Sequence, residues 1–79
     1  MTWSSSDAAR LVESLGYHYV RSRGHDIYEK PGETMHVSIP RDRKELASGT
    51  LASIFRRAGT TKAEAERFKN GRRSDRDKK

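Results

Sequence analysis

Apolar residues recur at helical spacing near the start of the chain. Ala8, Leu11, Val12 and Leu15 follow the i, i+3, i+4, i+7 rule, which places them on one face of a helix. Ser4 is a suitable N-cap residue, and the glycine at position 16 can adopt the left-handed conformation that ends many helices. The pattern therefore predicts an amphipathic helix over residues 4–15.

The same spacing returns in the second half of the chain, where it predicts a second helix over residues 48–58. Its apolar positions are Leu51, Ile54, Phe55 and Ala58, and a glycine follows at position 59. Further on, Thr61-x-x-Glu64 has the form of a capping box. This motif predicts a short third helix that ends near residue 69.

Between the helices the pattern changes to the features of strands. Residues 17–23 are rich in aromatic and β-branched residues, and residues 26–30 form a shorter segment of this kind. Pro31-Gly32 suits a type II turn. Met35, Val37 and Ile39 then alternate with polar residues up to Pro40, which predicts a half-buried third strand. The second and third strands are expected to pair antiparallel.

The predicted fold is α+β, with the order α-β-β-β-α and a short C-terminal helix. Both amphipathic helices are expected to cover one face of a three-stranded antiparallel sheet, which leaves the other face open to solvent or a partner. Residues 1–69 are expected to form a single domain. Residues 70–79 contain almost only Gly, Ser, Asn and charged residues, so a disordered basic tail is expected there.

The charge balance favours an anionic partner. The 79 residues include 17 Lys and Arg against 11 Asp and Glu, a net charge of +6 that favours RNA, DNA or another polyanion. No apolar run is long enough to span a membrane and no signal peptide is recognisable, so a cytoplasmic protein without membrane association is expected. With no cysteine and three dispersed histidines, no metal site and no cofactor are expected.

Several short motifs, in the same order, resemble those of HicA-type toxins. The segment from Gly16-Tyr17 through Val20-Arg21 to Gly24-His25 resembles the family's Gly-aromatic, apolar-Arg and Gly-Ser-His motifs. Val37-Ser38-Ile39-Pro40 resembles its third strand, and the segment from Gly49-Thr50-Leu51 to Arg57-Ala58-Gly59 resembles its second helix. The likeness spans residues 4–68. It implies a double-stranded-RNA-binding-like fold and a stress-response toxin of a type II toxin–antitoxin system. It also implies metal-independent cleavage of mRNA and neutralisation by a HicB-type antitoxin.

The chain departs from this family pattern at the histidine. Where the family has Gly-Ser-His, this chain has Arg23-Gly24-His25, one loop residue shorter. The spacing to Pro31 favours His25 as the counterpart of the family's histidine, but an alternative gap would align Asp26 there and leave no catalytic imidazole. Two functions therefore stay open: an RNA-cleaving toxin, and a non-catalytic RNA-binding module or degenerate toxin of the same fold.

The resemblance implies that His25 is the catalytic residue. RNA is cleaved when its 2′-OH attacks the adjacent phosphate, and an imidazole can serve as general acid or base near neutral pH. Arg21 and Arg23 alternate on one side of the first strand, where their guanidinium groups can bind phosphate beside Gly24 and His25. An exposed loop histidine and a pair of solvated arginines are the simpler interpretations.

Other basic residues are expected to attract RNA more generally. Lys30 lies at the far end of the predicted hairpin, His36 on the open face of the sheet, and Arg41 and Arg43 in the connection after the third strand. Each is also consistent with ordinary solvent exposure. The adjacent arginines 56 and 57 are most simply a solvated face of the second helix, with a contact to phosphate or antitoxin as the alternative.

Overall fold

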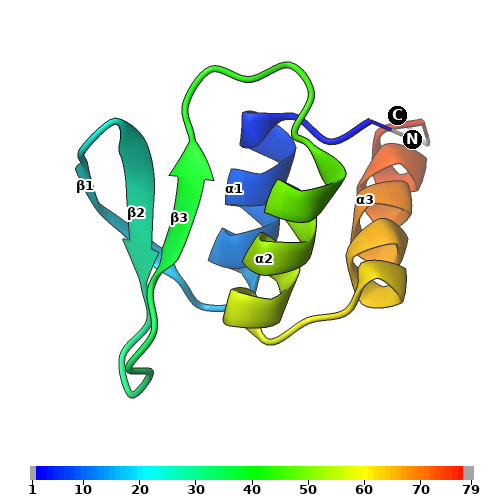
Figure 1. The fold of residues 1–79 in the computed structure, drawn as a ribbon. Helices are drawn as coiled ribbons and strands as arrows, with labels where there is room; N and C mark the ends of the chain where they lie inside the picture. Colours follow the sequence, from blue (N-terminus) through cyan, green and yellow to red (C-terminus); the bar gives the residue numbers. More distant parts are fainter. Residues whose placement is uncertain (1, 78–79) are drawn as a thin grey trace.

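Three layers make up the protein in this computed structural model, which describes the backbone of residues 2–77 and the side chains of residues 2–71. A sheet of β1 (His18–Ser22), β2 (His25–Glu29) and β3 (Val37–Pro40) packs against the helices α1 (Ser5–Ser14) and α2 (Ser48–Ala58). The helix α3 (Lys62–Asp77) lies on the far side of this pair (Figure 1). The predicted α+β fold, its element order and the position of both helices on one face of the sheet are confirmed.

The central strand of the sheet is β2, which pairs antiparallel with β1 on one side and β3 on the other. His25 lies opposite Pro40, and Tyr28 lies opposite Val37. The strand β3 begins later than expected, because the connection that follows Pro31 continues through residue 36. The expectation that Met35 belongs to the buried face of this strand is therefore wrong, and its side chain is 50% exposed.

The core lies between the sheet and the first two helices. Val12 from α1, Val37 and Ile39 from β3, and Ile54 from α2 are all fully buried. The helical stripes and the alternating positions of the third strand thus meet in one cluster, as their spacing predicts. Such a core stabilises the fold by roughly 1.5–3 kcal/mol for each fully buried large aliphatic side chain.

The N-terminal segment is held between α2 and α3. Trp3 is buried and packs edge-on against Phe55, with 5.3 Å between the ring centroids. Lys69 of α3 lies 5.1 Å from the centroid of the Trp3 ring, forms an ion pair of 3.1 Å with Asp7, and donates a hydrogen bond to the carbonyl of Thr2. These contacts tie the beginning of the chain to the third layer.

The capping expectations are confirmed at two helices. Ser4 and Asp7 form a reciprocal capping box at the start of α1, and the Thr61 hydroxyl accepts the Glu64 N–H at the start of α3. The helix α3 continues to Asp77, past its predicted end near residue 69. The disordered basic tail stays a prediction, and its last residues, 78 and 79, lie outside the described part of the chain. Within residues 2–77, no helix is both long and apolar enough to cross a bilayer.

Candidate active site

His25 is held by a tight turn between the first two strands. It is the first residue of β2, and its carbonyl accepts a hydrogen bond of 2.9 Å from the Arg23 N–H. Gly24 at the tip of the turn has φ of +78°, a conformation that glycine adopts without steric cost. The backbone of His25 is thus fixed on both sides while its side chain remains exposed.

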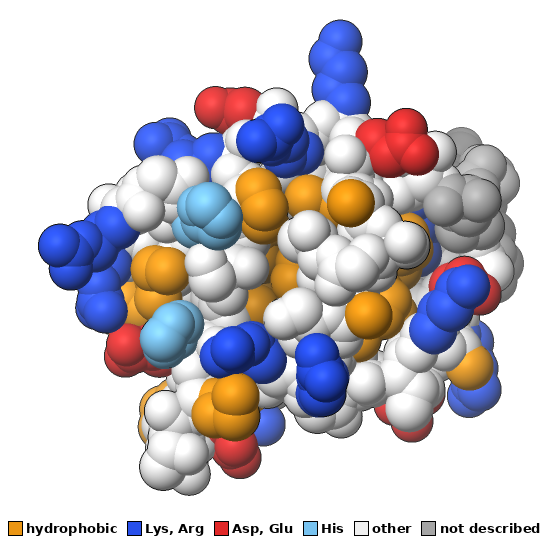
Figure 2. Space-filling view, in the orientation of Figure 1, with side chains coloured by type: hydrophobic (Ala, Val, Ile, Leu, Met, Phe, Trp, Pro, Cys, Tyr) orange, Lys and Arg blue, Asp and Glu red, His pale blue; other side chains and the backbone are white. Residues whose placement is uncertain are grey.

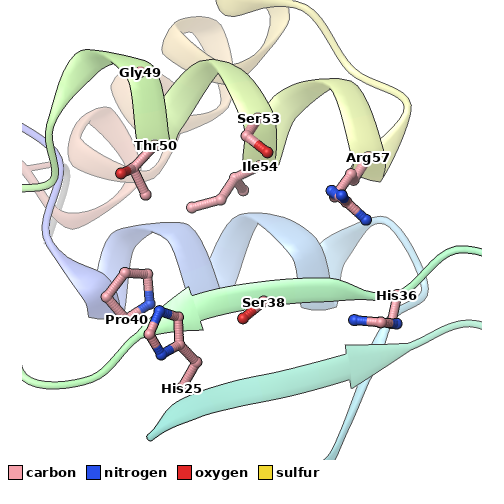
Figure 3. A pocket seen from close by; sticks show the side chains of 9 residues that line it. All are labelled: His25, His36, Ser38, Pro40, Gly49, Thr50, Ser53, Ile54 and Arg57. Atoms are coloured by element: carbon pink, nitrogen blue, oxygen red, sulfur yellow. The ribbon is translucent and has the colours of Figure 1, made fainter.

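A polar groove of about 450 Å³ runs between β3 and α2, with His25 at one end (Figure 3). Its lining residues, which define the polar groove, are His25, His36, Ser38, Pro40, Gly49, Thr50, Ser53, Ile54 and Arg57. No carboxylate is among these described residues, so the groove offers hydrogen-bond donors and a cation without a competing negative charge. This composition suits an anionic ligand.

The two competing counterparts of the family's histidine lie differently. The imidazole of His25 lines the polar groove. Asp26, the next residue along β2, lies opposite the buried Ile39, and its carboxylate is 3.4 Å from the guanidinium of Arg41. Because successive residues of a strand face opposite sides of the sheet, only His25 is available to a ligand in the groove.

Near His25, the first turn of α2 presents backbone N–H groups that lack helical acceptors. Ala47 is the N-cap residue and has no side chain that can accept a hydrogen bond. The first helical bond runs from the Leu51 N–H to the Ala47 carbonyl, so the N–H groups of Gly49 and Thr50 have no intrahelical acceptor. Both residues line the polar groove at the end that contains His25 (Figure 3).

At the other end of the groove, Arg57 from the last turn of α2 lies opposite His36 (Figure 3). The backbone of Arg57 is anchored, because the buried Tyr17 hydroxyl donates a hydrogen bond of 3.1 Å to its carbonyl. Burial, and then the negative charge of Glu33, raise the pKa of Tyr17 above its usual 10.0, which keeps this hydroxyl protonated. Within residues 2–71, no ion pair or side-chain hydrogen bond engages the Arg57 guanidinium.

Most of the other predicted RNA-binding residues lie outside the polar groove. Arg21 forms a half-exposed ion pair with Glu29 at 3.8 Å, and Arg23 and Gly24 are exposed at the turn. The Lys30 ammonium lies 5.8 Å from the centroid of the Tyr17 ring. Arg43 lines a neighbouring depression that shares Pro40 and Thr50 with the groove. Figure 2 shows exposed histidine side chains with lysine and arginine around them on the face that β3 and α2 form. The structure thus places His25 and His36 at opposite ends of one groove, whereas Arg21 and Arg23 do not line it.

Thr50 and Ser53 were not expected at the site from the sequence, and Arg57 was considered only together with Arg56, as an alternative to a solvated helix face. Thr50, Ser53 and Arg57 lie at i, i+3 and i+7, which places them on one face of the helix. This spacing could have identified the groove face from the sequence. It defines a polar face of α2 beside the apolar stripe, and it assigns Arg57 but not Arg56 to that face. Arg56 is exposed and does not line the groove. Among the described residues, no group of three or more His, Cys, Asp or Glu is arranged to bind a metal ion.

Comparison with known proteins places this geometry in a family. The family model described as HicA toxin of bacterial toxin–antitoxin matches residues 5–60, a range that contains α1, the sheet, α2 and every residue that lines the polar groove. A search of curated proteins found no significant match. Since the family model covers more than half of the chain, this protein belongs to the HicA family of toxins from bacterial toxin–antitoxin systems.

Proposed function

We propose that this toxin is a metal-independent endoribonuclease that cleaves mRNA, with His25 as its general acid and base. The observation that carries the proposal is the position of His25 in a groove that also contains Arg57 and the uncapped first turn of α2. Membership in the HicA family shows that the protein is a toxin. The resemblance of its sequence motifs to HicA-type toxins implies that the substrate is mRNA. The proposed site of action is the cytoplasm.

The reaction is an internal transfer at phosphorus. The 2′-oxygen forms a bond to the adjacent phosphorus while the bond from phosphorus to the 5′-oxygen breaks. His25 takes the proton from the 2′-OH, and the 5′-oxygen receives a proton from the protonated imidazole. The products carry a 2′,3′-cyclic phosphate and a free 5′-OH. General acid–base catalysis of this kind typically contributes a factor of about 10²–10⁴ in rate.

The first turn of α2 is suited to the negative charge that develops on the phosphate. A helix N-terminus attracts anions through its unpaired N–H groups and the helix dipole, and Gly49 allows the backbone to approach a ligand closely. A Cβ added to Gly49 would meet no atom within 4 Å, so packing does not require glycine there. This open space supports a close approach of the substrate to the backbone.

A toxin of this kind requires an inhibitor, and the toxin–antitoxin family implies an antitoxin partner. The proposed partner is a HicB-type antitoxin that covers His25 with an acidic surface. The exposed positive charges of Arg21 and Arg23 near the turn support an electrostatic contact there. A complex in which the antitoxin leaves the polar groove open would contradict this arrangement.

The first test is cleavage of a long mRNA in EDTA by the purified chain, by His25→Ala and by His18→Ala. His18 is also exposed but lies on β1, outside the groove, so it is a matched control. We expect His25→Ala to lower the cleavage rate by about 10²–10⁴ with unchanged circular dichroism, while His18→Ala keeps the rate of the natural chain. The 3′ ends of the products should carry cyclic phosphate.

Three outcomes would contradict the proposal. Equal cleavage by His25→Ala and the natural chain would assign the activity to another residue or to a contaminant. The absence of cleavage by the natural chain, together with retained RNA binding, would favour the non-catalytic RNA-binding alternative. Loss of activity in EDTA alone would show that cleavage depends on a metal.

A further inference from the structure

The end of the polar groove farthest from His25 has its own means of binding an anion. Arg57 and His36 lie opposite each other there, on α2 and just before β3 (Figure 3). The guanidinium of Arg57 is not engaged by another described side chain, whereas Arg21 and Arg41 are each paired with a carboxylate, at 3.8 Å and 3.4 Å. Arg57 is therefore a cation of the groove that is available to a ligand.

The two ends of the groove are separated by a similar length of backbone on both walls. At a rise of about 1.5 Å per residue, Gly49 and Arg57 are about 12 Å apart along α2. On the opposite wall, His25 pairs with Pro40, and His36 lies about 13 Å from Pro40 at the strand rise of about 3.3 Å per residue. The Arg57 side chain lies at the His36 end of the groove (Figure 3), so it is placed to contact a different phosphate from the one at His25.

We propose that Arg57 and His36 form a second phosphate subsite, which binds another backbone phosphate of the same RNA strand that is cleaved at His25. This inference rests on the proposed function and specifies how the substrate lies. The RNA is a single strand that runs lengthwise along the groove between β3 and α2. The subsite positions the strand so that its scissile phosphate reaches His25 and the first turn of α2.

The chemistry of the groove fits this arrangement. The guanidinium of Arg57 can donate two parallel hydrogen bonds to phosphate oxygens, and the His36 ring can donate one. Between the two ends, Ser38 and Ser53 face the groove and can donate hydrogen bonds to ribose or phosphate oxygens (Figure 3). Contacts of this kind fix the register of a strand but do not read its sequence. An unpaired strand is required because the 2′-OH must leave its helical position to attack in line.

The test measures binding of an RNA oligonucleotide in which every 2′-OH is methylated, so that it binds but is not cleaved. Arg57→Gln is compared with Arg56→Gln, which removes the same charge from the next residue of α2, outside the groove. Fluorescence anisotropy over a salt series gives the affinity and its salt dependence. Thermal melts of both variants check that the fold is retained.

We expect Arg57→Gln to weaken binding by about 10-fold or more, because a hydrogen-bonded charge contact contributes roughly 1.5–3 kcal/mol. Loss of one phosphate contact should also reduce the slope of log affinity against log salt by about 0.7. His36→Ala should weaken binding by a smaller factor, while Arg56→Gln and His18→Ala should leave it unchanged. Arg57→Gln should lower the cleavage rate of a long RNA more than that of a dinucleotide with a single phosphate, because the dinucleotide cannot occupy the subsite.

Equal affinities and equal salt slopes for Arg57→Gln and Arg56→Gln would overturn the subsite. An equally large loss for Arg57→Gln on the dinucleotide would also overturn it, because that substrate has no second phosphate. These outcomes are separate from a failure of the proposed function. If the natural chain binds RNA through Arg57 but does not cleave it, the subsite stands and the catalytic proposal fails.

Discussion

The two flanks of α2 border depressions of different character. On one side lies the polar groove, which contains the side chains of Thr50, Ser53 and Arg57. On the other lies a hollow of about 330 Å³ that is more apolar. Its walls include Trp3, Leu46, Leu51 and Phe55, together with the charged Glu45, Lys62 and Glu66. The apolar flank is braced by the N-terminal segment and α3, whereas the polar flank remains open.

The difference shows that the residues of one helix can serve two purposes according to their position. One set stabilises the fold, and another set lines the groove of the proposed function. Residues at one set of i, i+3 and i+7 positions bury apolar surface, and residues at another set face the groove. Among the α2 residues that line the groove, Thr50, Ser53 and Arg57 are not buried, so the fold tolerates polar and charged side chains at these positions. Substitutions on the two flanks should therefore change different properties.

The largest effect is expected from Phe55→Ala on the apolar flank. Phe55 is buried and packs against Trp3, and removal of a buried aromatic side chain typically costs about 3–5 kcal/mol of unfolding free energy. Ser53→Ala, on the polar flank of the same helix, should change it by less than about 0.5 kcal/mol. Urea denaturation followed by circular dichroism measures both. Similar losses in the two variants would break the comparison.

An intermediate effect is expected from Tyr17→Phe, which acts on the backbone of α2 at Arg57. The variant removes the hydrogen bond from the Tyr17 hydroxyl to the Arg57 carbonyl, and we expect the unfolding free energy to fall by about 0.5–1.5 kcal/mol. RNA binding should also weaken, by less than in Arg57→Gln, because the anchor of Arg57 loosens. Tyr19→Phe is the control, since Tyr19 is 54% exposed. Unchanged stability in Tyr17→Phe would show that the hydrogen bond does not brace the helix.

The smallest expected effect is the pH dependence of the stabilisation that the ion pair between Asp7 and Lys69 provides. Burial tends to raise the pKa of Asp7, but hydrogen bonds from Ser4 and the charge of Lys69 outweigh it and hold the pKa below its usual 3.8. A lowered pKa in the folded state stabilises the protein above pH 3.8, and this stabilisation is lost as the pH falls through the folded value. The difference in unfolding free energy between the natural chain and Asp7→Asn should therefore shrink between pH 6 and pH 3. A difference that grows in acid would contradict this ion pair.

Much of the fold was predictable because local spacing determines it. The stripes of α1 and α2, the capping box at Ser4 and the turn at Gly32 each depend on residues within a few positions of one another. Alternation was less reliable. The alternation of apolar and polar residues starts at Met35, but β3 pairs with β2 only from Val37 onward. Where a strand begins depends on its partner strand and not on the local sequence alone.

The candidate site was predictable only in part. The family resemblance indicated His25, and the face of His36 followed from strand alternation. The groove itself depends on the long-range packing of α2 against β3, which no local pattern reports. For this reason the distinction between Arg56 and Arg57 required the structure, although their helical spacing relative to Thr50 and Ser53 already differed.

The short turn at Gly24 has a consequence for the conformational entropy of the proposed catalysis. His25 belongs to the strand ladder, and its carbonyl is bound by the Arg23 N–H, so folding has already ordered its backbone. Fixing the backbone of a flexible loop residue costs about 1–2 kcal/mol, and a histidine on such a loop would incur this cost each time substrate bound. For His25, only the side-chain torsions would remain to be ordered when the proposed RNA substrate binds in the groove.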